Sequence, residues 1–298
     1  MPLQTQLSNK LGLKYPIVVA PMFIISNREM IVAAAEAGVL GTMPTLNART
    51  IEDLRADLEW IRERTDGPFG LNLTIGLTAP ERRELDMQLI EEFDVPVLIT
   101  SYGNPTAYIE RAHAQGITVL HDVINLKHAK KAEAAGADAI IGVAAGAGGH
   151  AGRISPYTLI PYLRENLSVP VVAAGCISTG EQVAASLALG AELVYMGTRF
   201  IASDECSAEA NYKKLVVEAV PEDLEYTDKV SGTHANFFKR TIPEHPDYDE
   251  SLAEDPGKRW KSVWSAGQGA SLIDEVKPIA AIVDDLVREY HSCVERLV

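Results

Sequence analysis

The chain has few cysteines, few aromatic residues and no long apolar run. Its three cysteines, Cys176, Cys206 and Cys293, lie far apart in sequence and form no CxxC or zinc pattern. We therefore expect reduced thiols in a cytoplasmic protein, and a disulfide-dense secreted scaffold is excluded. The longest charge-free stretch near the middle of the chain, 166–180, is 15 residues long and contains polar and proline breaks, so no membrane span is expected.

Positive charge is also scarce. The chain has 27 Lys and Arg against 41 Asp and Glu, a net charge of −14. Such a surface repels nucleic acids and anionic lipids, so neither is an expected partner. An anionic ligand would need a local positive site. The N-terminal segment lacks the basic region of a signal peptide, so none is expected.

The chain is rich in short apolar runs that alternate with helical patterns. Eight runs read as strands: 16–21, 39–43, 69–73, 95–100, 117–122, 139–143, 169–175 and 192–197. They are apolar throughout, which is typical of parallel strands covered on both faces. A helical pattern follows each run, beginning near 28, 50, 80, 105, 125, 156 and 178 and within 207–218. Eight strand–helix units predict an α/β protein with a (β/α)₈ TIM barrel, and an open doubly wound sheet is the alternative.

The pattern changes after residue 219. Residues 1–219 form the predicted barrel, and 220–262 are acidic and proline-containing, as in EHPDYDESLAEDPGKR. This segment is interpreted as an insertion that covers the barrel mouth. Residues 263–298 are amphipathic and predict one or two C-terminal helices that close the barrel.

Helix ends carry recognisable signals. Ser178 stands three residues before Glu181, the spacing of a capping box. Gly38, Gly136 and Gly190 each follow a helical segment and precede a strand, so each is expected to end its helix in the left-handed conformation.

In a parallel barrel, active sites gather at the carboxyl ends of the strands. The last two strand ends carry Gly175 and Cys176, and Gly197 and Thr198. Barrels often build a phosphate site from these loops, with main-chain N–H groups as donors. Arg199 could add a cation there or form a structural ion pair, and both readings stay open.

The stretch GAGGHAG, residues 146–152, places His150 alone among glycines and alanines. Glycine lets a backbone approach a ligand closely, and an imidazole titrates near neutral pH. We therefore favour a functional His150 over a loop histidine that merely bonds to the backbone.

Other titratable residues near the strand ends give weaker signals. His121 and His128 share no metal-binding motif with a carboxylate pair, so no metal site is expected. Asp122 could orient a neighbour or cap the helix at Asn125, and we favour the capping role.

Taken together, GAGGHAG, VVAAGCISTG, YMGTRFIAS and SAGQG resemble the nitronate monooxygenase family, formerly called 2-nitropropane dioxygenases. The resemblance extends from APM at 20–22 through FGLNL at 69–73 to WSAGQG at 264–269. It implies an FMN-dependent barrel with the flavin phosphate on the last two strand loops and the isoalloxazine across the barrel mouth.

The resemblance also assigns roles to single residues. His150 falls on the catalytic base, and Gln268 would close the site from the C-terminal segment. The remaining implied cofactor-binding residues are Ala20, Pro21, Met22, Asn72, Gly148 and Gly149 near the ring, and Gly175, Cys176, Gly197 and Thr198 at the phosphate.

Four positions depart from the common family pattern. Val143 stands in place of a glutamine, Gly146 in place of a glutamate, and Cys176 in place of a glycine. Cys176 can still donate its N–H but would be strained at positive φ. His234 stands where relatives commonly carry another residue.

The implied activity is oxidation of alkyl nitronates, or of nitroalkanes after loss of a proton to His150, with O₂ to a carbonyl compound and nitrite. The alternatives are an FMN-dependent NAD(P)H:quinone reductase or enoyl-thioester reductase, a non-catalytic flavin-binding protein, and a flavin-free barrel acting on phosphorylated metabolites. The oligomeric state stays open, with a homodimer as the candidate assembly.

Overall fold

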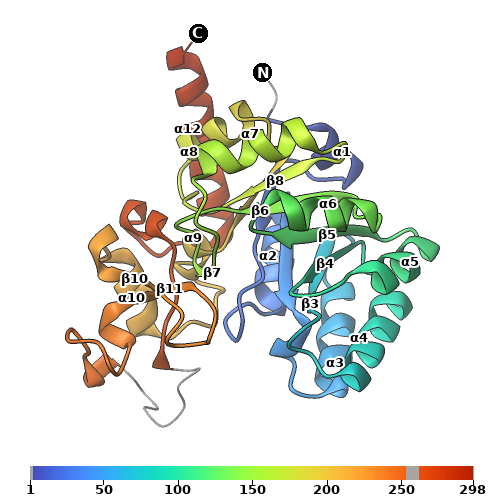
Figure 1. Cartoon of the computed structure of the whole chain (residues 1–298), viewed down its shortest axis with the longest axis horizontal. Coiled ribbons are helices and arrows are strands. Elements are labelled where there is room, and N and C mark those ends of the chain that lie inside the picture. Colours follow the sequence, from blue (N-terminus) through green and yellow to red (C-terminus); the bar gives the residue numbers. More distant parts are fainter. Residues whose placement is uncertain (1–2, 253–261, 298) are drawn as a thin grey trace.

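The computed structural model describes residues 3–252 and 262–297. Its main body is a closed barrel of eight parallel strands that follow one another in chain order (Figure 1). These are β1 (Ile17–Val19), β2 (Leu40–Pro44), β3 (Phe69–Thr74), β4 (Val97–Ser101), β5 (Thr118–Val123), β6 (Ala139–Val143), β8 (Val171–Ala174) and β9 (Leu193–Met196). The predicted (β/α)₈ barrel is confirmed, and the open sheet is wrong.

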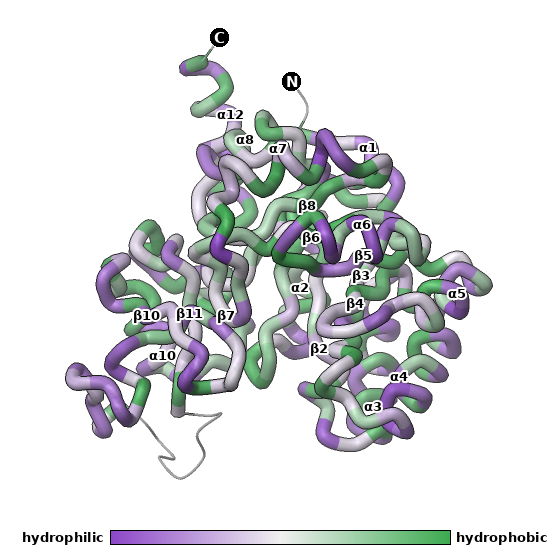
Figure 2. Tube along the Cα trace, viewed as in Figure 1, coloured by the Kyte–Doolittle hydropathy of each residue, from purple (hydrophilic) through white to green (hydrophobic). Residues whose placement is uncertain are grey.

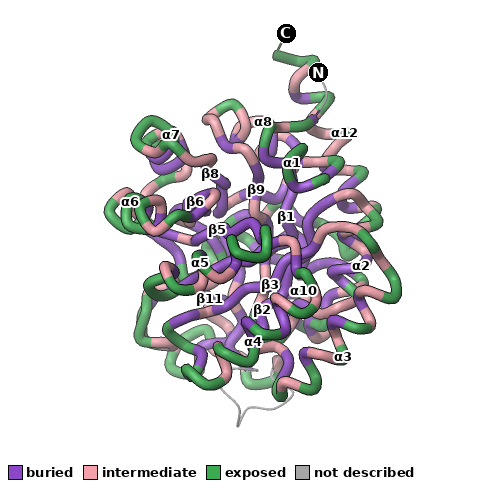
Figure 3. The backbone as a smooth tube through the Cα atoms, turned by 90° about the vertical axis from the view of Figure 1, so that its right-hand side faces the viewer, coloured by how far each residue is buried: buried purple, intermediate pink, exposed green. Residues whose placement is uncertain are grey.

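Helices surround this barrel. They are α2 (Arg28–Glu36), α3 (Ile51–Arg62), α4 (Pro80–Glu92), α5 (Thr106–Ala114), α6 (Leu126–Ala134), α7 (Pro156–Asn166), α8 (Gly180–Ala188) and the short α9 (Thr198–Ile201), while α10 (Ala210–Val217) lies beside the barrel (Figure 1). Hydrophilic and hydrophobic stretches alternate along them (Figure 2), and their outer faces are exposed while the strands are buried (Figure 3). No helix among the described residues is both long and apolar enough to cross a membrane.

The ends of the helices test the capping predictions. Gly38, Gly136 and Gly190 have φ of +81°, +100° and +99°, which confirms their left-handed conformation. The capping box of α8 is formed by Thr179 and Gln182, one residue later than predicted. Thr179 is extended and its side chain accepts from the Gln182 N–H, so it and not the preceding serine is the N-cap.

The barrel interior is closed at its amino-terminal end by α1 (Gln6–Lys10). Leu7, Leu11 and Leu13 belong to the same buried cluster as the inward-facing strand residues Val18, Leu40, Ile99, Leu120, Ile141, Val172 and Leu193. The Leu7 N–H donates to the carboxylate of Glu192 just before β9. No sequence pattern predicted this plug, because α1 is only five residues long.

A second, antiparallel sheet stands beside the barrel. Its strands are β10 (Leu224–Thr227), β11 (Ala235–Phe238) and β7 (Gly149–His150), in the order β10-β11-β7. The segment after the barrel therefore pairs directly with the glycine loop (Figure 1). Residues 253–261 of the predicted 220–262 insertion lie outside the described residues, and the division into 1–219, 220–262 and 263–298 stays a prediction.

The chain ends in α12 (Ile279–Leu297), which packs against α8 and α2. Gly180 at the start of α8 allows this close crossing, since a Cβ there would lie 2.2 Å from the Leu286 carbonyl oxygen and 2.4 Å from the Tyr290 nitrogen. The Gly180 N–H donates to the Glu289 carboxylate at 2.7 Å. The C-terminal segment is thus attached to the end of the barrel that carries the β8 loop.

We predict that Leu7→Ala destabilises the protein by about 3 kcal/mol, because it opens a cavity in the barrel plug. The measurement is the urea midpoint of unfolding. Asn9→Ala, an exposed change on the same helix, should alter stability by less than about 0.5 kcal/mol. Equal midpoints for the two variants would show that α1 does not close the barrel core.

Candidate active site

Inward-facing side chains at the carboxyl ends of the strands line the barrel mouth. The strand register places five side chains on this inner wall. Ser101, Asp122, Val143 and Tyr195 lie two residues beyond members of the interior cluster, and Asn72 is the register partner of its member Ile99. Most of them are polar, whereas the layer beneath is aliphatic. The mouth is therefore the chemically equipped end of the barrel.

Asn72 is held firmly on this wall. Its amide nitrogen donates to the Ile99 carbonyl at 3.3 Å and to Ser101 Oγ at 3.2 Å, and its oxygen accepts from Thr74 Oγ1 at 3.1 Å. The side chain is buried and its orientation is fixed by barrel atoms. Its predicted contact with a flavin ring stays a prediction.

The end of β1 lies next to the end of β9. The Ala20 N–H donates to the Met196 carbonyl at 3.0 Å, and a Cβ added to Gly197 would lie 3.6 Å from the side chain of Met22. Met22 is half-buried, as is Pro21 before it. The predicted ring contacts of β1 and the predicted phosphate contacts of β9 are thus neighbours in space.

The two predicted phosphate turns follow adjacent strands. Gly175 has φ of +110° and Cys176 has φ of +57°, so the strain expected for Cys176 at positive φ is present. In the described part of the chain, the N–H groups of Cys176 and Gly197 donate to no backbone acceptor, whereas the register Ala174↔Tyr195 turns the Gly175 N–H toward the Tyr195 carbonyl. Unpaired main-chain donors at half-buried positions fit an anionic group such as a phosphate.

The position of the Cys176 side chain explains why residue 146 is a glycine. A Cβ on Gly146 would lie 2.3 Å from Cys176 Sγ and 2.8 Å from Gln268 Oε1, and Gly146 has φ of +78°. The sulfur sits 3.4 Å from the Ala145 carbonyl oxygen, and burial raises the pKa of the thiol. The two departures from the family pattern therefore complement each other sterically.

The glycine loop is clamped by the C-terminal segment. The Gln268 N–H donates to the Gly146 carbonyl at 2.8 Å, and the Gly149 N–H donates to Ser265 Oγ at 2.5 Å. A Cβ on Gly148 would lie 2.8 Å from the Gly267 nitrogen and 3.0 Å from Thr198 Oγ1. The Gly267 N–H in turn donates to Thr198 Oγ1 at 2.9 Å, so the C-terminal segment that clamps the glycine loop is also bonded to the end of β9.

His150 lies on the small strand β7, opposite Ala235 of β11. The imidazole is exposed, its ring centroid is 5.3 Å from that of Tyr102, and its Nε2 is 3.1 Å from Ser231 Oγ. The protein around it lowers the pKa of His150, because partial burial disfavours the imidazolium. The imidazole is therefore at the mouth and favours the neutral form.

Asp122 is a mouth residue and not a helix cap. The N-cap of α6 is Asn125 itself, whose side chain accepts from the His128 N–H. Asp122 is on the inner wall, where burial raises the pKa of its carboxyl to about 7. Burial, together with this nearby carboxyl, also raises the pKa of Tyr195. Because side chains alternate along a strand, Asp122 faces the same side as Leu120, which lies two residues earlier, in the interior cluster.

The side chains of His121 and Arg199 form hydrogen bonds within the protein. His121 faces the opposite side of β5, with Nδ1 2.8 Å from Thr100 Oγ1, and burial lowers its pKa to about 4. Arg199 is buried and donates to the Glu275 carbonyl at 3.3 Å, among acidic groups of the C-terminal segment. Its role as a phosphate-binding cation and its role in a structural ion pair both stay predictions.

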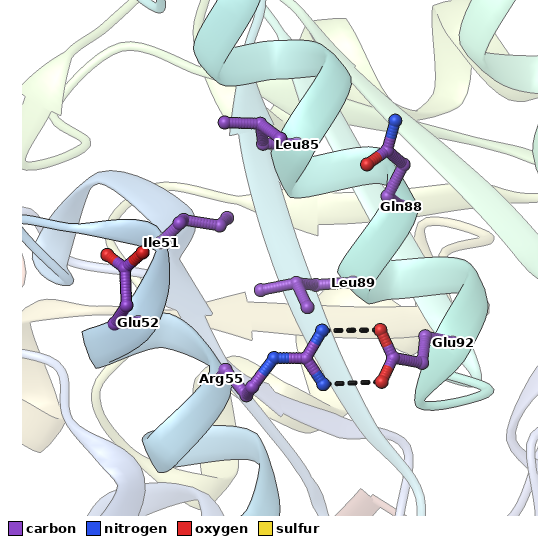
Figure 4. A pocket seen from close by; sticks show the side chains of 7 residues that line it. All are labelled: Ile51, Glu52, Arg55, Leu85, Gln88, Leu89 and Glu92. Atoms are coloured by element: carbon purple, nitrogen blue, oxygen red, sulfur yellow. Dashed lines mark hydrogen bonds and ion pairs between the residues drawn. The ribbon is translucent and has the colours of Figure 1, made fainter.

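One groove lies apart from this mouth, and no metal site was found among the described residues. A groove of about 270 Å³ lies between the outer helices α3 and α4, and its Arg55 is paired in a bidentate manner with Glu92 (Figure 4). With its cation already neutralised, this groove offers no reactive group. Among residues 3–252 and 262–297, no group of three or more His, Cys, Asp or Glu side chains could hold a metal ion.

Comparison with known proteins agrees with the fold. The family model described as nitronate monooxygenase matches residues 4–247. A probable nitronate monooxygenase of Staphylococcus saprophyticus is 25% identical over 99% of this chain and 100% of that protein. The solved structure of FabK from Thermotoga maritima superimposes with a TM-score of 0.87 at 33% identity, covering 99% and 98% of the two chains. Nitroalkane oxidase from Streptomyces ansochromogenes gives 0.85 at 26% identity, covering 98% and 99%.

The pKa of Asp122 predicts a pH-dependent stability. In the unfolded chain this carboxyl ionises near its ordinary value of 3.8, but in the folded protein it ionises near 7. The folded state therefore loses stability as pH rises from about 4 to about 7, and Asp122→Asn removes this loss. We expect the variant to gain on the order of 3 kcal/mol over the wild type above pH 7 and to match it near pH 4.

Denaturant unfolding at pH 4, 5.5, 7 and 8.5 measures this difference. Asp53→Asn on the exposed start of α3 is the control and should show no comparable trend. A constant offset between Asp122→Asn and the wild type at all four pH values would disprove the raised pKa.

Proposed function

The chain belongs to the nitronate monooxygenase family, and on this basis we propose that it oxidises alkyl nitronates with O₂ at an FMN bound across the barrel mouth. Family membership makes the protein an oxidoreductase. The observation that carries the proposal is the position of His150, which stands at the mouth on a loop joined to the end of β9 through Gly267 and Thr198.

The cofactor assignment rests on the donors at the strand ends. The family is generally flavin-dependent. The N–H groups of Cys176 and Gly197 suit the FMN phosphate, and Gly175 and Thr198 stand beside them. Ala20, Pro21, Met22, Asn72, Gly148 and Gly149 would lie along the ring, and Gln268 would close the site. Bound there, FMN would supply the electron acceptor for the nitronate and the redox link to O₂.

The contacts of His150 indicate which nitrogen acts as the base. The Ser231 hydroxyl donates its single hydrogen to the Thr233 carbonyl at 2.9 Å. It must therefore accept from Nε2–H of His150, which leaves the lone pair on Nδ1. Nδ1 of the neutral imidazole would take the α-proton of a nitroalkane, and the resulting imidazolium would pair with the nitronate oxygens. The products are a carbonyl compound and nitrite.

The FabK likeness favours a second candidate, an FMN-dependent enoyl-thioester or quinone reductase. Such an enzyme needs a nicotinamide to reduce its flavin. Anaerobic bleaching of the visible spectrum by NADH or NADPH would support this candidate over the oxidase. A protein that stays yellow but turns over no nitronate, quinone or enoyl substrate would be a non-catalytic flavin binder.

We predict that the purified protein is yellow, that it releases FMN on denaturation, and that it consumes O₂ when given a small alkyl nitronate. The absorption spectrum and an oxygen electrode measure these properties. A colourless preparation that cannot be reconstituted with FMN would contradict the cofactor assignment and favour a flavin-free barrel acting on phosphorylated metabolites.

We predict that His150→Asn retains FMN and loses turnover of neutral nitroalkanes by about 10²-fold or more, the typical contribution of a positioned base. Preformed nitronates need no proton removal, so their turnover should fall much less. His234→Asn is the matched control, since His234 lies on the adjacent segment and contacts Arg153. Equal losses with nitroalkanes and nitronates would remove the base role of His150.

A further inference from the structure

Large apolar side chains are exposed at the carboxyl ends of four strands. We call Phe23, Ile24, Leu77, Tyr102 and Ile124 the apolar rim. They follow β1, β3, β4 and β5, and each is between 39% and 62% exposed. These strand ends surround the same mouth as the candidate active site. Exposed apolar groups gathered at one functional end of a protein mark a binding surface.

The apolar rim is in contact with the catalytic loop. Tyr102 stands 5.3 Å from the His150 ring. A Cβ on Gly152, two residues after His150, would lie 3.2 Å from Ile124 Cβ, so Ile124 borders the same loop. A Cβ on Gly76 would lie 2.4 Å from the Tyr102 carbonyl oxygen, which places Leu77 next to Tyr102. Tyr102, Ile124 and Leu77 therefore extend outward from the imidazole, and Phe23 and Ile24 form the part of the rim that follows β1.

Two residues of the apolar rim have a strained backbone conformation. Ile24 has φ of +72° and Tyr102 has φ of +61°, in a region that β-branched and bulky residues rarely adopt. Asn47 stabilises the β1 loop, because its Oδ1 accepts from the Ile24 N–H at 2.8 Å and its Nδ2 donates to the Met22 carbonyl at 3.0 Å. Strained residues that are fixed in place cluster at functional sites.

We propose that the apolar rim binds the hydrocarbon chain of the substrate, so that the enzyme acts on nitronates with medium or long alkyl chains in preference to the smallest ones. This substrate class rests on the proposed function. The anionic head group would lie beside His150 and the alkyl chain would run outward over Tyr102, Leu77 and Phe23. A second copy of the chain docked on the rim would instead cover the imidazole.

The binding test uses straight-chain carboxylates from acetate to octanoate as unreactive planar anions on the holoenzyme. Isothermal titration calorimetry should give dissociation constants that fall by about fourfold for each methylene that reaches the rim. The double variant Phe23→Ala, Leu77→Ala should bind acetate as the wild type does and octanoate at least tenfold more weakly. Leu85→Ala, which removes a 40% exposed leucine from outer helix α4, is the control and should change neither value.

The outcomes separate this inference from the proposed function. Affinities that do not depend on chain length in the wild type, or a uniform loss at all lengths in the double variant, would overturn the rim proposal. So would a change of oligomeric state in the double variant, measured by size-exclusion chromatography with light scattering, since the rim would then be a subunit interface. Chain-length-dependent binding without nitronate turnover would leave the rim standing and reject the nitronate activity.

Discussion

The site depends on the hydrogen bonds that hold a glycine loop between two distant segments. Gln268 and Ser265 bind the loop from the C-terminal side, and Asn236 donates to the Ala147 carbonyl at 2.7 Å from β11. A run of glycines has high conformational freedom in the unfolded chain, so it would not present His150 in one position by itself. The pairing of β7 with β11 fixes the imidazole, and the clamp by the 264–268 segment brings the loop to the end of β9.

This clamp restricts which side chains the loop can carry. Cys176 fills the space beside Gly146, and Gly148 is pressed against the 266–267 backbone and Thr198. A residue larger than glycine at 146 would displace both the sulfur and Gln268. In this packing, a side chain at 146 and the cysteine at 176 therefore exclude each other.

Sequence patterns were sufficient for the barrel and insufficient for the parts that depend on long-range pairing. Eight apolar runs with glycine-ended helices specify the (β/α)₈ fold locally, because each unit forms from neighbouring residues. The partners of β7 lie more than 80 residues away in a segment whose acidic and proline content suggested only an excursion. The capping role predicted for Asp122 is wrong because its place in the strand, two residues after the inward Leu120, outweighs its place before a helix, as the strand register shows. The positions of the strand-end glycines and of His150 could be predicted, since strand ends can be located from sequence, while their roles stay predictions.

Charge and apolar surface have to be considered together at this mouth. A protein with net charge −14 repels an anionic substrate at long range, so electrostatic steering cannot recruit it. Below about pH 7 the Asp122 carboxyl is largely neutral, and the unpaired N–H groups of the β8 and β9 turns are the nearest favourable partners for an anion. For the proposed nitronate substrate, the alkyl part would supply the favourable contact at the entrance, because hydrophobic contact does not depend on the sign of a charge. In the proposed function the apolar rim would take the place of a positively charged entrance, and the strained residues Ile24 and Tyr102 would hold that apolar surface in position.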